Sequence, residues 1–232
     1  NGFFEHFFEK VRSKKSELHK YRLLITPSHF YASEFSNRMQ VPIRGIHLGV
    51  HLHDFQYKDK IDDLKNEFFE DSGIVILLPS RFQTKQKGHD VALKACVILK
   101  EKGIKFKMIF TGIKPSSEKY IPDFTNLVEQ YDLSDYVKIT TFSDIQTAYN
   151  NCDIVISPEK YCSYGLSISE ALALGIPTIL SNIPTYVEIA QDFKHAIFFE
   201  NESHEDLAQK LLLTIRKQKT RYREEAIRFR TE

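Results

Sequence analysis

The sequence has too few cysteines, with the wrong spacing, for a disulfide framework or a zinc site. Its 232 residues include three cysteines, Cys96, Cys152 and Cys162, which are odd in number and widely separated. Small secreted domains and zinc sites carry cysteines in characteristic paired spacings instead. We therefore expect a reducing, cytoplasmic setting.

The sequence also lacks long apolar runs and a large net charge. No uninterrupted apolar stretch approaches the roughly 20 residues of a transmembrane helix, and the N-terminus lacks the basic-then-apolar order of a signal peptide. Lysine and arginine number 32 against 31 acidic residues, so no overall field exists that would hold a nucleic acid. The expectation is a cytoplasmic protein, either free or peripheral to a membrane, that does not bind nucleic acid.

The sequence does contain enough apolar residues, 42%, for one large or two small cores. From Gly73 onward, apolar runs rich in β-branched residues alternate with helical patterns. The runs are "IVILLP", "KFKMIFTG", "YVKIT", "DIVISP", "IPTIL" and "AIFFE". Strands without polar alternation are buried on both faces, as in a parallel sheet covered by helices on each side. The predicted fold class is α/β, with a doubly wound parallel sheet.

Helices are predicted between and after these strands. They cover residues 88–102, 120–131, 144–151, 165–174, 185–190 and 204–217. Ser203 stands where its hydroxyl can cap the last helix, with Asp206 at the capping-box position. That helix start is therefore well marked in the sequence.

The first seventy residues follow a different pattern. A helix is predicted over "FFEHFFEKVRSKKSEL", a strand over "RLLITPS" and a short helix near residues 30–39. The first helix has an apolar stripe of phenylalanines, for which packing on a partner or on a missing lobe is favoured over membrane binding. We assign residues 1–45 to the end of another lobe and a connector, and residues 46–232 to the main domain.

Two strand ends carry residues that suit a phosphate group. In open parallel sheets ligands bind where strands end and helices begin, because free helix N–H groups and the helix dipole favour an anion there. Arg81 follows the first strand, and Lys87 directly precedes Gly88 at the start of a helix. Together the two cations suit a diphosphate, although both are also compatible with an exposed loop. Gly112 ends the second strand and lets the backbone approach a ligand, or simply forms a turn.

A third strand end has the sequence "SPEKYCSYGLSISEALALGIPTILSN". Gly165 permits a sharp turn, after which the N–H groups of Gly165, Leu166 and Ser167 can point free of partners. Glu170 lies one turn further on, where its carboxylate can accept hydrogen bonds from two neighbouring hydroxyls, as on a ribose. The segment predicts a nucleotide or sugar phosphate site, with an ordinary helix-capping carboxylate as the alternative.

A metal site is not predicted. His47, His51 and His53 with Asp54 have suitable donor atoms, but three histidines on an extended segment need not converge, and a hinge loop is the favoured interpretation. The sequence has no Asp-x-Asp for a catalytic divalent ion.

Several segments resemble the landmarks of the GT-B-fold retaining glycosyltransferases of the glycogen synthase and sucrose synthase kind, the family 4 type. They are "IRGIHLGV", "PSRFQTKQKGHDVALKACVILKEKG", "FKMIFTG" and "AYNNCDIVISPEKYCSYGLSISEALALGIPTILSN", and the similarity covers about residues 20 to 230. The resemblance implies a Rossmann-like C-terminal donor-binding lobe preceded by a remnant of the N-terminal lobe. It also implies metal-independent transfer, with retention, from a UDP- or GDP-sugar to an acceptor sugar, lipid or protein, and no cofactor.

The resemblance also assigns roles to individual residues. Arg81 and Lys87 match the pair that binds the diphosphate, and Glu170 matches the carboxylate that binds the ribose. Gly165 and Leu166 match the turn whose amides meet the phosphate. The rest of the donor segment is expected to line the substrate site, namely Cys162, Ser163, Tyr164 and Ser167, together with Gly112 on the neighbouring loop.

The sequence departs from the family at one position of the motif. Cys162 stands where the family has the first of two glutamates, and Glu159, three residues earlier, is expected to reach the donor sugar only if the loop is rearranged. A thiol cannot accept the strong hydrogen bonds that a carboxylate takes from sugar hydroxyls. Either the donor sugar is unusual, or transfer is impaired, or the lobe only binds, in which case it is a binding or assembly module. A sugar-nucleotide epimerase shares the architecture and is a third possibility.

The family's acceptor site and usual catalytic histidine lie in the N-terminal lobe, of which this sequence has only the last elements. We therefore expect a fragment, or a subunit whose partner chain supplies the rest.

Overall fold

The computed structural model describes residues 20–51, 73–82, 84–112, 115–140, 145–217 and 222–231. The chain divides by its contacts into two compact units, Asn1–Gly49 and Val50–Glu232. The sequence placed the boundary slightly earlier, between residues 45 and 46, and the assignment of the two parts to two lobes stays a prediction. The predicted helix over residues 3–18, with its phenylalanine stripe, lies outside the described residues.

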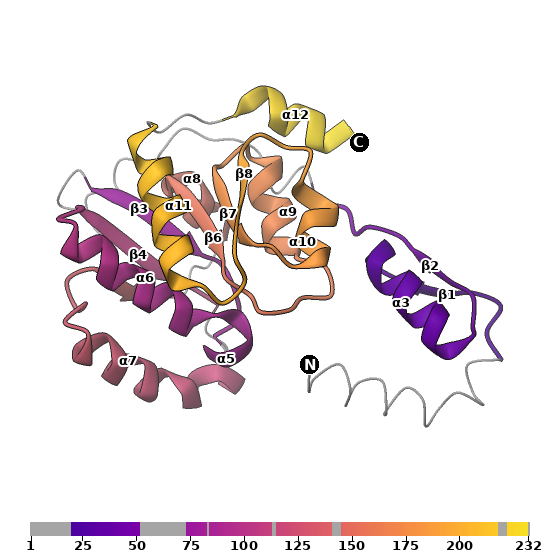
Figure 1. Cartoon of the computed structure of the whole chain (residues 1–232), viewed down its shortest axis with the longest axis horizontal. Helices are drawn as coiled ribbons and strands as arrows, with labels where there is room; N and C mark the ends of the chain where they lie inside the picture. The colour runs from indigo at the N-terminus through magenta and orange to yellow at the C-terminus, as the bar shows by residue number, and fades with distance from the viewer. Residues whose placement is uncertain are drawn as a thin grey trace. The chain divides into compact units, whose positions relative to one another are not determined.

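The smaller unit contains one β-α-β crossover, drawn in indigo in Figure 1. Strand β1 (Leu24–Thr26) runs parallel to β2 (Ile43–Gly45), and α3 (His29–Met39) connects them. Ser28 caps α3 by accepting a hydrogen bond from the N–H of Tyr31 at 3.3 Å. The predicted strand and short helix of this region are confirmed.

Six strands of the larger unit form one parallel sheet in the order β5-β4-β3-β6-β7-β8. They are β3 (Ile74–Leu78), β4 (Phe106–Phe110), β5 (Val137–Ile139), β6 (Ile154–Ser157), β7 (Thr178–Ser181) and β8 (Ala196–Phe199). The chain moves outward from β3 to β5, returns to the other side of β3 with β6, and continues to β8 (Figure 1). The strand order thus reverses between β3 and β6, which confirms the doubly wound α/β fold.

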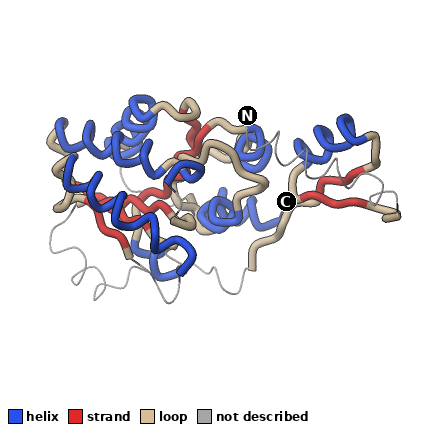
Figure 2. Tube along the Cα trace, turned by 90° about the horizontal axis from the view of Figure 1, so that it is seen from below, coloured by secondary structure: helices blue, strands red, loops and turns tan. Residues whose placement is uncertain are grey.

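Helices cover both faces of this sheet (Figure 2). They are α5 (Thr84–Lys87), α6 (His89–Glu101), the 3₁₀ helix η1 (Pro115–Tyr120), α7 (Ile121–Gln130), α8 (Ile145–Asn151), α9 (Leu166–Ala173), α10 (Pro184–Ala190), α11 (His204–Arg216) and α12 (Arg223–Thr231). Helices α6, α7 and α11 pack with Ile76 and Leu78 of β3, whereas α8, α9 and α10 pack with Val75 and Leu77. Side chains of a strand alternate between its faces, so two apolar faces explain the continuous apolar runs.

The ends of the helices follow local signals in the sequence. Ser203 accepts a hydrogen bond from the N–H of Asp206 at 3.1 Å, which confirms the predicted cap of α11.

Helix α12 packs on α9, and the Nε of Arg230 donates to the carbonyl of Ala173 at 2.8 Å. Among the described helices, none combines the length and the apolar character that crossing a bilayer requires.

His195 is fully buried just before β8. Its Nε2 lies 3.2 Å from the carbonyl oxygen of Leu172, and its ring stacks on that of Tyr222 with 5.6 Å between centroids. Burial lowers the pKa of His195, because the charged imidazolium would lose its hydration inside the protein. The folded protein therefore favours the neutral form of this side chain.

We expect the free energy of unfolding to decrease as the pH falls below 6.5, the ordinary pKa of histidine. The folded pKa of His195 is depressed, so the unfolded chain binds more protons between that pKa and 6.5, and the stabilisation present above 6.5 is lost toward lower pH. Urea unfolding at about pH 7.5 and about pH 5.5 measures this change on either side of the ordinary pKa. A His195→Gln variant should show a smaller difference between the two pH values. The same difference in both proteins would contradict the assignment.

Candidate functional site

The candidate site lies at the carboxyl ends of β3, β4 and β6, beside the point where the strand order reverses. Ligands of doubly wound sheets bind at such a point, because the loops that follow the strands on its two sides run apart. Arg81 follows β3, Gly112 follows β4, and Glu159 follows β6. Arg81, Gly112 and Glu159 therefore follow the carboxyl ends of the strands, where a ligand is expected.

Arg81 is exposed, and its guanidinium has no ion-pair partner among the described residues. Gly112 has a φ of +85°, and a Cβ built on it would lie 2.2 Å from the carbonyl oxygen of Ser80. The N–H of Phe82 donates to the carbonyl of Gly112 at 3.3 Å. Gly112 thus brings the loop after β4 into direct contact with the loop that carries Arg81. Its contact with a ligand stays a prediction.

Lys87, at the end of α5, forms a buried ion pair with Glu159. The Nζ of Lys87 lies 2.6 Å from Oε1 of Glu159, and the two side chains are only 11% and 3% exposed. The sequence had predicted Lys87 as a cation for a diphosphate without assigning it a partner. The structure pairs it with a carboxylate, so the two side chains together are neutral.

Hydrogen bonds to and from main-chain atoms hold the loop around Glu159 on both sides. The hydroxyl of Ser181, at the end of β7, donates to the carbonyl of Glu159 at 2.6 Å. The N–H of Lys160 donates to the carbonyl of Gln86 at 3.0 Å, and Nδ2 of Asn201 donates to the carbonyl of Lys160 at 3.1 Å. These bonds tie the loop after β6 to α5 and to the loop after β8. The Glu159 side chain therefore starts from a fixed backbone.

Gly88 separates α5 from α6 and brings this turn against the same loop. Its φ is +66°, and an added Cβ would lie 1.9 Å from the carbonyl oxygen of Pro158. We expect Gly88→Ala to destabilise the protein by about 1–3 kcal/mol more than Gly103→Ala, because its methyl group must displace backbone. Gly103 is the matched control, since its φ is +68° but nothing lies within 4 Å of its added Cβ. Urea unfolding measures both variants, and equal losses would contradict the close approach.

Cys162 is a neutral thiol in this environment. Burial, followed by the negative charge of Glu159, raises its pKa to about 11, although the ammonium of Lys87 acts in the opposite direction. The carbonyl of Cys162 accepts a hydrogen bond from the Thr185 hydroxyl at 3.0 Å. A thiol with this pKa is protonated at neutral pH, so Cys162 is not an activated nucleophile.

Tyr186 of α10 links the start of α9 to this group. A Cβ on Gly165, whose φ is +122°, would lie 2.7 Å from Cε1 of Tyr186. The Tyr186 hydroxyl is 2.7 Å from Oγ of Ser157, and burial together with the charge of Glu159 raises its pKa well above the ordinary value. The turn at Gly165 therefore packs on a buried tyrosine whose pKa the charge of Glu159 affects.

The first turn of α9 leaves main-chain donors available. The carbonyl of Gly165 accepts hydrogen bonds from the N–H groups of Ile168 and Ser169 at 3.0 and 3.1 Å. Within the described chain the N–H groups of Leu166 and Ser167 have no hydrogen-bond acceptor. Unpaired amides at a helix start are the groups that bind an anion.

Glu170 is half-buried on α9, and the hydroxyl of Tyr149 from α8 contacts it. The Tyr149 hydroxyl lies 2.8 Å from Oε2 of Glu170 and 2.9 Å from the carbonyl oxygen of Ser167. Burial raises the pKa of Glu170, and the hydrogen bond from Tyr149 opposes that increase. Tyr149 therefore orients one carboxylate oxygen and leaves the other for a further donor.

The structure joins some of the predicted residues and leaves others apart. Lys87 is paired with Glu159, Cys162 lies under the electrostatic influence of both, and Gly165 lies against Tyr186, whereas Arg81 lies on the adjacent loop without a hydrogen bond or ion pair to them among the described residues. Ser163 is exposed and Tyr164 is buried. Sequence reasoning gave no role to Tyr149 or Tyr186, because nothing near them in the chain indicates their partners. Glu159 did carry a signal, since it directly follows a buried strand.

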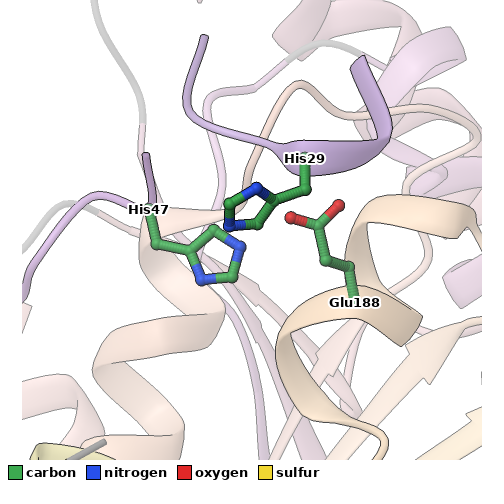
Figure 3. Close-up of side chains that lie close together, drawn as sticks. All are labelled: His29, His47 and Glu188. Atoms are coloured by element: carbon green, nitrogen blue, oxygen red, sulfur yellow. The ribbon is translucent and has the colours of Figure 1, made fainter. Parts of the chain in front are cut away.

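Of the histidines considered as metal ligands, His47 lies beside His29 of α3. Their rings meet edge to face, with 4.9 Å between centroids, and both side chains are labelled in Figure 3. Glu188, also labelled there, belongs to α10 of the larger unit. His53 and Asp54 lie outside the described residues. Two imidazoles are fewer donors than protein metal sites use, and the absence of a metal stays a prediction.

The sequence matches the family "Glycosyl transferases group 1" over residues 59–228, which is most of the chain, so the chain belongs to that family. Two relatives from Escherichia coli are similar to part of it. WcaL of strain K12, provisionally named a colanic acid biosynthesis glycosyltransferase, is 32% identical over 117 residues, 45% of this chain and 28% of WcaL. The O-antigen biosynthesis glycosyltransferase WclY is 32% identical over 107 residues, 46% of this chain and 28% of WclY.

Solved structures show the same fold. A glycosyltransferase from Rickettsia africae aligns with a TM-score of 0.81 and 22% identity over 100% of this chain and 62% of its own. Anabaena HepE, solved with UDP and glucose, aligns with a TM-score of 0.78 and 16% identity over 94% of this chain and 61% of its own. The alignments with WcaL and WclY span less than a third of those proteins, and those with the two structures span about three fifths of them. The fold is that of the GT-B glycosyltransferases.

Proposed function

We propose that this chain is the donor-binding part of a retaining glycosyltransferase that uses a UDP- or GDP-sugar and needs no metal ion. The observation that carries this proposal is that Lys87 and the open amides of α9 follow β3 and β6, the two neighbouring strands at which the strand order reverses. Family membership and the crystal structure of HepE in complex with UDP and glucose support it. The acceptor, whether sugar, lipid or protein, and any partner chain remain to be identified by experiment.

In such a transfer negative charge grows on the departing diphosphate. Arg81 offers a planar fork to phosphate oxygens, and Lys87 has N–H groups beyond the one directed at Glu159. The N–H groups of Leu166 and Ser167 add donors that are already oriented by the helix. These fixed positive groups supply the stabilisation for which other enzymes use a metal ion.

The remaining residues position the rest of the donor. Glu170, oriented by Tyr149, accepts hydrogen bonds from the two ribose hydroxyls. The backbone of Gly112 closes the diphosphate side, and the segment from Cys162 to Tyr164 borders the sugar. Because Cys162 is a neutral thiol, it contacts the sugar without reacting with it.

Calorimetric titration of the chain with UDP, GDP, UDP-glucose and GDP-mannose tests this proposal, with EDTA present to remove metal ions. Binding of a nucleoside diphosphate that EDTA does not abolish is the expected result, and no binding of any of the four would overturn it. Consumption of the bound donor, with product of unchanged anomeric configuration, identifies a retaining transferase. Interconversion of donor sugars without an acceptor would instead identify an epimerase, and binding without any turnover in the presence of acceptors would identify a binding module.

A further inference from the structure

Only one of the two carboxylate oxygens of Glu159 contacts Lys87 in the ion pair. Oε1 contacts the Lys87 ammonium at 2.6 Å, whereas Oε2 is buried and accepts no hydrogen bond from a described residue. Glu159 as a whole is 2% exposed. A buried carboxylate oxygen without a donor is unfavourable, and native proteins rarely keep one that has no use.

The described groups around this carboxylate supply only a weak donor, because the hydrogen bond between it and Cys162 comes from a thiol. The Cys162 thiol is a weak donor, and burial keeps it protonated. The Tyr186 hydroxyl is engaged with Oγ of Ser157 at 2.7 Å. The bonds from Ser181 and to Gln86 hold the loop backbone, and the ion pair with Lys87 holds the carboxylate itself. The carboxylate therefore keeps acceptor capacity for a stronger donor than the thiol.

We propose that Glu159 accepts hydrogen bonds from hydroxyl groups of the donor's sugar, and so takes over the role that Cys162 cannot fill. This inference rests on the proposed function. With Lys87 at the diphosphate, a carboxylate 2.6 Å from its ammonium lies next to the sugar attached to the distal phosphate. The ammonium has three N–H groups, so it serves Glu159 and a phosphate oxygen together. Glu159 and Cys162 belong to the same loop, which follows β6.

The negative charge of Glu159 should act differently on the binding of a nucleoside diphosphate and of a nucleotide sugar. A carboxylate beside the phosphates repels them, so it weakens the binding of a bare nucleoside diphosphate. Sugar hydroxyls that donate to the carboxylate form charge-assisted hydrogen bonds, which are stronger than those to a neutral amide. Removing the charge should relieve the repulsion for both ligands but weaken the sugar contact only for the nucleotide sugar, so the two affinities should change unequally.

The measured quantity is the ratio of two dissociation constants, that of UDP or GDP divided by that of the matching nucleotide sugar. In Glu159→Gln we expect this ratio to fall about tenfold, with the nucleoside diphosphate bound as well as before or more tightly. Glu202→Gln is the matched control, because Glu202 also pairs with a lysine, Lys160, but its side chain is 57% exposed. The control should leave both constants unchanged.

Addition of Cys162→Glu to Glu159→Gln should restore the ratio, because it returns a carboxylate to the sugar. An unchanged ratio in Glu159→Gln would overturn the inference and leave Glu159 as only the counter-ion of Lys87. The same conclusion follows if the unaltered chain binds nucleoside diphosphates and a sugar adds no affinity. Failure to bind any nucleotide would instead defeat the proposed function itself. If Glu159→Gln does not fold, Glu159→Ala is measured instead, since it also lacks the carboxylate, and an unchanged ratio there also overturns the inference.

Discussion

Replacement of Arg81 by alanine is expected to lower the rate of donor turnover about 100- to 1,000-fold. Its guanidinium is exposed and has no ion-pair partner among the described residues, so its full charge is available to a ligand. Lys87 is already neutralised by Glu159, which leaves Arg81 as the side chain with uncompensated charge in the proposed diphosphate site. The loss should fall mainly on the rate, because charge on the diphosphate increases as the bond to the sugar breaks.

Steady-state turnover with a saturating nucleotide sugar measures the loss in Arg81→Ala. Arg216→Ala, on the exposed end of α11, is the matched control and should keep the original rate. Arg81→Lys should recover only part of the activity, since an ammonium cannot bind two phosphate oxygens with a planar fork. Full activity in Arg81→Ala would show that the diphosphate is bound elsewhere.

Replacement of Lys87 by methionine is expected to destabilise the fold by about 3–5 kcal/mol. The substitution leaves the carboxylate of Glu159 buried and without its cation, and a buried unpaired charge is the costly result of breaking such a pair. The double variant Lys87→Met/Glu159→Gln removes both charges and should lose much less stability than the single variant.

Urea unfolding followed by circular dichroism compares the single and double variants at neutral pH. Lys102→Met is the matched control, because Lys102 is an exposed lysine at the end of α6 and should change the free energy of unfolding by no more than about 0.5 kcal/mol. Equal stabilities of the single and double variants would show that the pair is not a buried ion pair. Lys87→Met is also expected to lose affinity for the diphosphate. Its binding is therefore measured without urea, at a temperature at which this variant is folded.

The sheet and its helices were predictable because their signals are local. An apolar run such as "IVILLP" can be accommodated only where both faces of a strand are buried, and it became β3 (Ile74–Leu78) with a core on each side. The cap at Ser203 was predictable for the same reason, since the hydroxyl and its partner amide are three residues apart. The order of the strands does not follow from their patterns, but short connections through helices favour a doubly wound sheet.

The candidate site was only partly predictable. The resemblance identified the glycosyltransferase family, which the match over residues 59–228 confirms, while retention, donor and metal independence stay proposals. Local sequence placed Glu170 one turn after Gly165, but it did not reveal that Tyr149 of α8 contacts it at 2.8 Å. Such a contact depends on how two helices pack on one sheet face, which no spacing along the chain records.

The sequence by itself determined the kind of fold, the family and the strand ends at which a ligand is expected, because apolar patterns and glycine turns act over a few residues. Only the tertiary structure decided that Lys87 is paired with Glu159, and that Oε2 of this carboxylate is buried without a donor. The physical reason is that the charge a ligand meets depends on which side chains lie within a few ångströms of one another. The parallel strands β3 and β6, distant in sequence and adjacent in the sheet, bring those side chains together.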